Sequence, residues 1–271
     1  MGDFLVLMTK PFVTCLVLAG IHTYLGLHVI QRGVIFVDLA LAQVAALGAT
    51  VGFLLGFGLH TTGSYFLSLA FTVASAGIFS LLRSRGDEIP QEAYIGVVYA
   101  VAAAASILIL SIVPEGGEEL KALLVGHILF VDWGEIIKVL SIYLLVGAVH
   151  WRFRDPLLSI SHDADRAAAK GMNVKAWDFL FYVTFGVVVT SSVEVAGVLL
   201  VFSFLVVPAV CGVLLAGSTS SRFMTGWFCG FVTSVIGIVA SYCFDLPTGA
   251  MVVCTFGACL LVCLGFHRVR C

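Results

Sequence analysis

The sequence predicts an all-α, polytopic membrane protein with eight to nine transmembrane helices. Of its 271 residues, 61% are hydrophobic and only 11% are charged, whereas soluble domains average about 25% charged residues. The apolar residues gather in stretches close to the roughly 20 residues that a helix needs to cross a bilayer. So few charged residues cannot cover a water-exposed surface, which argues against a soluble enzyme. The net charge of −2 gives no general basic surface for nucleic acid.

Nine apolar segments are long enough, or nearly long enough, to span a membrane, and we interpret residues 1–271 as a single transmembrane domain. The first segment lacks a short apolar region that ends in a small-residue cleavage site, so it is not a signal peptide. Only a tight turn near Glu194 separates the sixth and seventh, which leaves eight spans plus a re-entrant segment as the alternative. The segments are 12–30, 34–56, 63–82, 93–113, 135–151, 177–193, 195–215, 223–243 and 246–266.

The distribution of Lys and Arg predicts the orientation, because these residues prefer cytoplasmic loops. With nine spans, three of the 14 Lys and Arg residues fall on one side and all the others fall on the opposite side. The three are Lys10, Lys121 and Lys138. The N-terminus is therefore expected outside and the C-terminus in the cytoplasm.

Two connections between spans are long. Residues 114–134 face outward in this topology, and their apolar part is too short to span, so we expect a surface or re-entrant segment. Residues 152–176 face the cytoplasm and form the most polar stretch of the chain.

Within the cytoplasmic connection, the sequence predicts a short helix from Asp163 to Lys170. Asp163 or Ser161 can cap its first turn, and Gly171 suits the position that follows its last turn. Such a helix can be a rigid docking element through which a cytosolic partner moves the membrane helices. The alternative is that residues 152–176 are an ordinary solvated loop.

Three polar residues inside the apolar spans are candidates for the transport pathway, because polar groups are expensive in lipid. Asp38 lies about 9 Å into the second span, counted from Arg32, and Gln43 lies about 16 Å in. His22 lies in the middle of the first span. Oxygen and imidazole ligands suit divalent transition metals such as Zn, Mn and Fe. Alternatively, Asp38 pairs with Arg32, and His22 is a packing residue.

Other polar residues and the cysteines have simpler explanations. Asp245 is expected to cap the last helix, with Pro247 near its first position, and Glu194 can be a loop carboxylate. Most of the eight cysteines lie in apolar stretches, where cysteine is usually a small packing residue. Disulfides or a soft-metal pair at Cys259 and Cys263, four residues apart, are the alternatives.

The chain lacks the motifs of common enzymes. No G-x-x-x-x-G-K-[ST] loop for ATP is present, and neither H-E-x-x-H nor G-x-S-x-G occurs. We therefore predict a transport protein without its own catalytic residues or cofactor.

Five stretches resemble the permease subunits of bacterial metal ABC transporters, the zinc, manganese and iron family called ABC-3 permeases. Together they run from about Gly20 to Arg268, in the family's order. They are GLHVIQRGVIFVDLALAQVAALG, EAYIGVVYAVAAAASILILS with LLVGHILFV, SHDADRAAAKGMNVKAWDFLFY, SSVEVAGVLLVFSFLVVPA and SYCFDLPTGAMVV. The resemblance implies a type II ABC importer fold in the bacterial inner membrane.

The resemblance also implies partners. Two permease copies would form the pathway, and cytosolic ATPase subunits that bind ATP would dock on the coupling segment, here centred on Asp163, Ala167 and Gly171. An extracytoplasmic binding protein would deliver the divalent metal. The family typically has a histidine four residues after the aspartate of the second span. Here Ala42 stands four residues after Asp38, and Gln43 stands five residues after it. This departure leaves the metal open.

Two alternatives to a metal-ion permease remain. A permease for a metal chelate such as a siderophore would need no strong ligands in its pathway. A secondary transporter driven by an ion gradient would be favoured by inverted repeats, which the sequence does not show.

Overall fold

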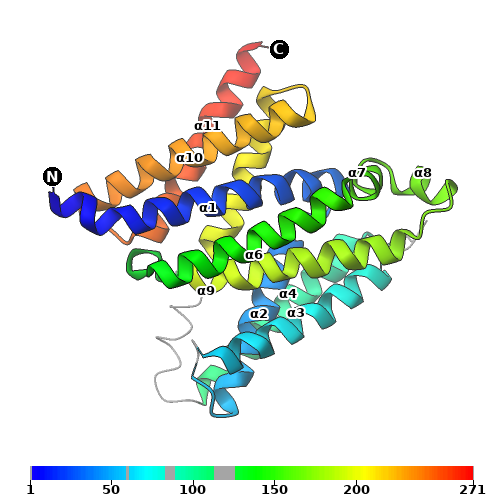
Figure 1. Ribbon diagram of the computed structural model, residues 1–271, viewed down its shortest axis with the longest axis horizontal. Helices are drawn as coiled ribbons and strands as arrows, with labels where there is room; N and C mark the ends of the chain where they lie inside the picture. The colour runs from blue at the N-terminus through cyan, green and yellow to red at the C-terminus, as the bar shows by residue number, and fades with distance from the viewer. Residues whose placement is uncertain (1, 59–60, 83–88, 113–125, 271) are drawn as a thin grey trace. The chain divides into compact units, whose positions relative to one another are not determined.

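The computed structural model describes residues 2–58, 61–82, 89–112 and 126–270 (Figure 1). Within these ranges all regular secondary structure is helical, which confirms the predicted fold class. The helices are α1 (Gly2–Arg32), α2 (Val37–Leu54), α3 (Thr62–Leu82), α4 (Gln91–Ser111), the 3₁₀ turn η1 (Ile128–Phe130), α6 (Trp133–Arg152), α7 (Arg154–His162), α8 (Ala164–Ala169), α9 (Val174–Leu215), α10 (Thr219–Phe244) and α11 (Thr248–Arg270).

Eight of the described helices are long and apolar enough to cross a membrane. One of them, α9, has 42 residues, which at 1.5 Å per residue is about 63 Å, roughly twice the bilayer core. Gly197 interrupts it with a non-helical backbone (φ 74°, ψ 162°) that essentially only glycine adopts. α9 therefore consists of two helices, each long enough for a span, and both predicted counts of eight and nine describe the same chain.

The interruption lies at Gly197 rather than near Glu194, where the sequence placed a turn. Residues from before α6 support it. The His127 amide donates a hydrogen bond to the Val195 carbonyl at 3.2 Å, which the interruption removes from the helical ladder. Gly126 (φ 71°) packs so closely that a Cβ there would lie 2.2 Å from the carbonyl carbon of Ala196.

The chain divides into two compact units, each discontinuous in sequence. The first contains the chain up to Ile30, Leu124–Ser141 and Val195 onward, and the second contains Gln31–Leu123 and Ile142–Glu194. Helices α1, α6 and α9 each contribute to both.

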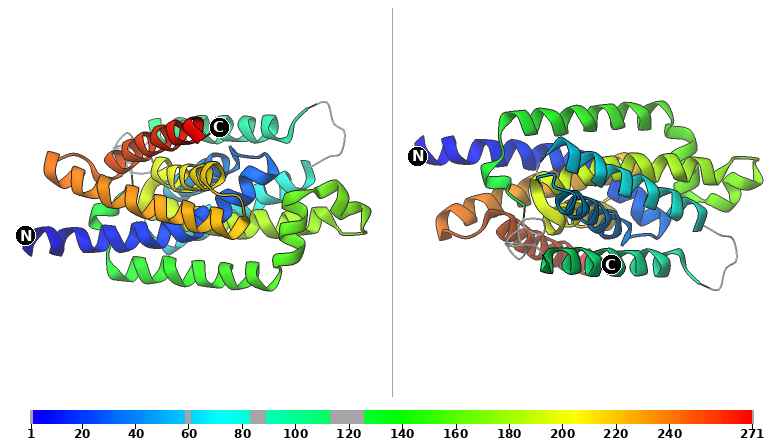
Figure 2. Two further views of the ribbon diagram at one scale, coloured as in Figure 1. Left: turned by 90° about the horizontal axis from the view of Figure 1, so that it is seen from above. Right: turned by 90° about the horizontal axis from the view of Figure 1, so that it is seen from below.

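In the first unit, α10 packs beside α11 (Figure 2). α11 also contacts η1. Glycines allow close approach between helices: a Cβ on Gly226 of α10 would lie 2.5 Å from the Pro208 carbonyl oxygen of α9. In the second unit, α2 is the central helix and packs on both α3 and α4. A Cβ on Gly48 of α2 would lie 2.6 Å from the Ser68 Cα of α3, so these two helices touch almost backbone to backbone.

Two sequence predictions change at element ends. Asp245 does not cap the last helix; it ends α10 in the left-handed conformation (φ 51°), because the chain must turn sharply before α11 begins at Thr248. The predicted outward segment 114–134 lies partly outside the described residues. From residue 126 onward it forms η1 and the start of α6.

Candidate functional site

Asp38 is a buried carboxylate without a hydrogen-bond partner. It lies in the first turn of α2, its exposure is 0%, and among the described residues neither carboxylate oxygen has a hydrogen-bond partner. The alternative that Asp38 pairs with Arg32 is wrong, because Arg32 pairs with Asp178 instead. Buried polar groups are normally satisfied, so the unsatisfied carboxylate keeps Asp38 a candidate for the transport pathway.

Hydroxyl groups of α3 and α6 form hydrogen bonds to hydroxyl groups of α9 in the second unit. The Ser192 hydroxyl donates to the Val188 carbonyl at 2.5 Å, so the Tyr143 hydroxyl donates to Ser192 Oγ at 2.6 Å. In the same way Tyr65 donates to Ser191 Oγ at 2.8 Å. Tyr143 also interacts electrostatically with Asp38. The Tyr65 and Tyr143 hydrogen bonds thus join α3 and α6 to α9, and Tyr143 is the member of this set that interacts with Asp38.

The other two predicted pathway residues lie in different places. Gln43 is on α2 with Asp38 and is 7% exposed. His22 belongs to the first unit, where its Nδ1 is 2.8 Å from the Leu18 carbonyl oxygen one turn earlier. That contact agrees with the packing interpretation of His22. The structure therefore brings Gln43, but not His22, into the same unit as Asp38.

The connection at residues 152–176 contains the predicted capped helix. The Asp163 carboxylate accepts a hydrogen bond from the Arg166 amide at 2.9 Å, which satisfies the first turn of α8. At the other end, the Gly171 and Met172 amides donate to the carbonyls of Ala168 and Ala167, and Gly171 has a positive φ of 82°. Both predicted caps are thus confirmed, and α7 precedes α8 as a second short helix.

The three predicted coupling residues differ in exposure. Asp163 and Gly171 are exposed, whereas Ala167 is 1% exposed. Ala167 therefore packs α8 onto the protein and does not present a side chain to a partner.

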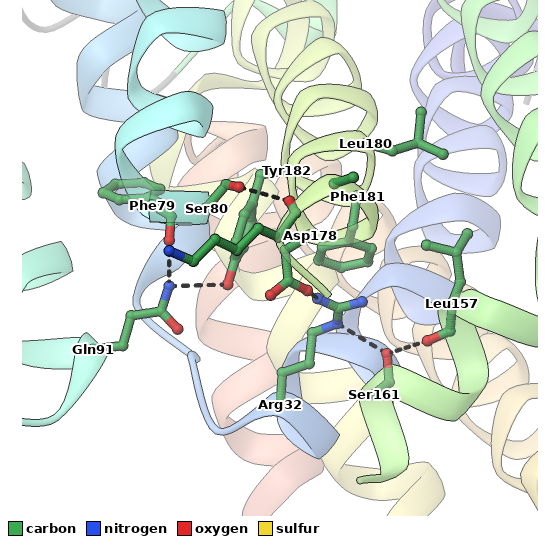
Figure 3. A network of polar contacts seen from close by, with 12 residues as sticks. Arg32, Phe79, Ser80, Gln91, Leu157, Ser161, Asp178, Leu180, Phe181 and Tyr182 are labelled. Carbon is green, nitrogen blue, oxygen red and sulfur yellow. Dashed lines mark hydrogen bonds and ion pairs between the residues drawn. The ribbon is translucent and has the colours of Figure 1, made fainter. Parts of the chain in front are cut away.

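Arg32 links the short helix α7 to two of the membrane helices (Figure 3). Its Nε donates to Ser161 Oγ of α7 at 2.9 Å, and a terminal guanidinium nitrogen is 2.5 Å from the Asp178 carboxylate of α9. Both charged side chains are fully buried. The guanidinium also lies 3.9 Å from the centre of the Phe181 ring. One side chain thus joins the end of α1, the end of α7 and the start of α9.

Three further hydrogen bonds extend this network to α3 and α4 (Figure 3). Gln91 Nε2 donates to the Phe79 carbonyl at 2.8 Å and to the Tyr182 hydroxyl at 3.3 Å. The Ser80 hydroxyl donates to the Lys175 carbonyl at 2.8 Å. The start of α9 is therefore fixed on several sides by side chains of the second unit.

Sequence reasoning missed the Arg32–Asp178 pair and the two tyrosines. Arg32 was counted only as a cytoplasmic charge, and Asp178 sits at the apparent edge of a span, where a charge attracts no notice. Tyr65 and Tyr143 look like ordinary aromatic residues of membrane helices. Buried-charge pairing at the ends of two spans is the signal that could have found the pair.

The chain was compared with known proteins. Residues 5–267 match the family model described as the ABC 3 transport family. The chain is 25% identical over 247 residues to the "Manganese transport system membrane protein MntC" of Listeria innocua, covering 91% of this chain and 85% of that protein. It is 22% identical over 263 residues to a "Probable iron transport system membrane protein" of Haemophilus influenzae, covering 97% and 94%.

A solved structure shares the fold. In the structure titled "PsaBC from Streptococcus pneumoniae in complex with Fab", one chain superimposes with a TM-score of 0.80 at 22% identity, covering 97% of this chain and 94% of that one. The family match extends over nearly the whole sequence, and it confirms the predicted class of membrane-spanning ABC transporter permease. The chain belongs to the ABC 3 transport family.

Proposed function

We propose that this chain is the permease subunit of an ATP-driven importer of Mn(II) or Fe(II), and that Asp38 is a ligand of the ion in the pathway. The buried, unpartnered carboxylate of Asp38 carries the proposal. An isolated carboxylate in a low-dielectric interior is costly, and a passing divalent cation would supply the missing interaction. Because the ion leaves again, a site with a single charged ligand suits passage better than a closed cage of several.

The ligand chemistry favours Mn(II) or Fe(II) over Zn(II). The oxygen atoms that the second unit offers are those of the Asp38 carboxylate itself and the hydroxyl of Tyr143, which interacts with it. Carboxylate, carbonyl and water ligands suit Mn(II), whereas Zn(II) prefers nitrogen and sulfur. The two positions at which the family's histidine could stand are Ala42 and Gln43. The names of the relatives, which are manganese and iron transport proteins, point the same way.

ATP would act from outside this chain. We propose that a cytosolic ATPase subunit binds the exposed face of α7 and α8 and that hydrolysis in that subunit moves this segment. Arg32 contacts Ser161 and Asp178, so a movement of α7 would also move α1 and α9. A charge pair that is buried and multiply hydrogen-bonded has few alternative arrangements, so it transmits displacement instead of absorbing it.

The remaining partners follow from the same assembly. We propose a second permease copy, an extracytoplasmic binding protein that delivers the metal, and the bacterial plasma membrane as the location. The Lys and Arg distribution supports a cytoplasmic C-terminus, which places α7 and α8 on the ATPase side. A reporter enzyme that is active only in the cytoplasm, fused after residue 271, tests this orientation.

Elemental analysis of cells tests the function. Cells that lack their own manganese and iron importers would express this chain with its ATPase and binding protein, and Mn, Fe and Zn would be measured after a pulse of each metal. We expect accumulation of Mn or Fe that depends on this chain. Accumulation of Zn alone would refute the ligand argument, and uptake by this chain in liposomes without any ATPase would refute the ABC mechanism.

A further inference from the structure

Four cysteines converge in the first unit, on three different helices. The thiols of Cys211 (α9), Cys259 and Cys263 (α11) all lie within 4.8 Å of one another. The thiol of Cys229 (α10) lies close enough to those of Cys211 and Cys259 to interact with them. None of the four is in a disulfide. The sequence alone indicated only the pair Cys259 and Cys263 on α11. Helix packing brings Cys211 and Cys229 close to this pair.

We propose that these cysteines form a binding site for a thiophilic divalent cation of the Zn(II) type, separate from the transport pathway. Tetrahedral coordination with Zn–S bonds of about 2.3 Å places the sulfur atoms about 3.8 Å apart. The sulfur atoms of Cys211, Cys259 and Cys263 lie at most 4.8 Å apart, so these three side chains need shifts of about 1 Å at most to reach that geometry. Cysteine side chains can make such shifts by small χ1 rotations without movement of the helices.

The surroundings suit a tightly held soft metal. Cys211 is 0% exposed and Cys263 is 6% exposed, so water competes little for the ion once it is bound. Cys229 and Cys259 are only partly buried, which leaves a way in. The Thr233 hydroxyl, one turn beyond Cys229, lies near Cys259 and can donate a hydrogen bond to its thiolate, as groups around metal ligands commonly do.

The chemistry needs no redox partner. Each thiol that binds the ion releases its proton to solvent, and a metal–sulfur bond replaces the sulfur–hydrogen bond. All four cysteines belong to the first unit and Asp38 belongs to the second, and thiols and carboxylates select different metals. The cysteine site therefore does not depend on what the permease carries.

An occupied site would join α9, α10 and α11 through one ion. These helices need to move relative to one another if the first unit changes shape during transport, and a metal that bridges three of them opposes such movement. Zn(II) bound at the cysteines would thus slow transport by the permease, whereas the transported ion, which oxygen atoms bind, would not.

Metal binding to the purified full chain tests the proposal. The protein, kept reduced and free of a histidine tag, would be exposed to Zn(II) or to Cd(II), desalted and measured by elemental analysis and by the sulfur-to-cadmium absorption band. We expect about one ion per chain in the wild type and in the control Cys254→Ser. Cys254 is on α11 but exposed, five residues from Cys259 and so on another face. The triple variant C211S/C259S/C263S should bind none.

A second measurement does not depend on a variant that folds. Thiols of the wild-type chain would be alkylated with and without Zn(II) and located by mass spectrometry. Zn(II) should protect Cys229 and Cys259, which are partly buried and can be reached by the reagent, and should leave the exposed Cys243 and Cys254 reactive. The proposal is overturned by no metal in the wild type, by metal retained in the triple variant, by protection that does not distinguish the two groups, or by a native disulfide within the cluster.

Discussion

Arg32 and Asp178 form an ion pair at 2.5 Å with both side chains withdrawn from solvent. They lie 146 residues apart in sequence, at the end of one membrane helix and the start of another. Ser161 of α7 donates its own hydroxyl proton to the Leu157 carbonyl and accepts a hydrogen bond from Arg32, so α7 is bound to the pair. Removing either charge leaves the other buried and alone, whereas removing both leaves an apolar contact with the Phe181 ring.

The pair makes separate predictions for stability and for coupling. Asp178→Asn or Arg32→Met should each lower the free energy of unfolding by about 3–5 kcal/mol, and the double variant Arg32→Met/Asp178→Leu should recover most of it. Thermal unfolding in detergent measures this. The double variant should nevertheless transport poorly, because it lacks the Arg32 side chain that links Ser161 of α7 to Asp178 of α9.

Arg154 supplies the control for that prediction. It forms an ion pair with Asp155 at 3.5 Å, and the two side chains are 56% and 88% exposed. Pairs in water contribute little, so Arg154→Ala should change stability by no more than about 0.5 kcal/mol. If Asp178→Asn is equally harmless, the buried pair is not a structural link.

Asp38→Asn should reduce metal uptake to the background of cells without the permease. The amide keeps the shape of the side chain but loses the charge that binds a divalent cation, so assembly with the ATPase should be unaffected. Uptake of radioactive manganese or iron and co-purification of the ATPase measure the two effects. Asp245→Asn is the matched control, since this exposed aspartate has a positive φ of 51° that asparagine also accepts. Wild-type uptake by Asp38→Asn would remove Asp38 from the pathway.

Tyr143→Phe should weaken transport without abolishing it. The tyrosine donates to Ser192 and interacts with Asp38, so it positions the site and is not required as a ligand. Loss of such a partner typically lowers metal affinity about 10–100-fold. We expect a raised KM for metal with a nearly unchanged maximal rate. A fall in maximal rate alone would place Tyr143 in the moving parts of the protein instead.

Gly171→Ala should uncouple ATP hydrolysis from transport. The glycine has a φ of 82°, and no atom lies within 4 Å of the place that a Cβ would occupy, so the cost is conformational, about 1–2 kcal/mol, and falls on the end of α8. Uptake per ATP hydrolysed by the reconstituted complex measures coupling. Gly217→Ala is the control, because Gly217 also has open space but no positive φ. Equal coupling in both variants would exclude the end of α8 from the docking surface.

Local features of the fold were predictable from sequence, and long-range pairings were not. The α8 caps follow from Asp163 and Gly171, which act on their own neighbours along the chain. Asp38 stood out because one charged residue in an apolar span is informative alone. By contrast, Asp178 becomes meaningful only beside Arg32, and Cys211 only beside α11. Such neighbours are set by tertiary packing, which no local pattern in the sequence specifies.

The interruption of α9 at Gly197 also combines a local feature, which the sequence predicts, with long-range contacts, which it does not. A break between two spans was predictable from the length of the apolar stretch, but its position at Gly197 depends on Gly126 and His127, about 70 residues earlier in the chain. Gly126→Ala should destabilise this junction, because its Cβ would overlap the Ala196 backbone at 2.2 Å; overpacking of this kind costs about 1–3 kcal/mol.

Hydrogen exchange of the Val195–Val198 segment, followed by mass spectrometry, would detect the change directly. Gly96→Ala is the control: Gly96 lies within α4 with open space around it, so alanine there should stabilise the helix by about 0.5–1 kcal/mol. Faster exchange is expected at the junction in Gly126→Ala and not in Gly96→Ala. Unchanged exchange in Gly126→Ala would mean that the loop before α6 does not hold the interruption, and that Gly197 alone sets its position.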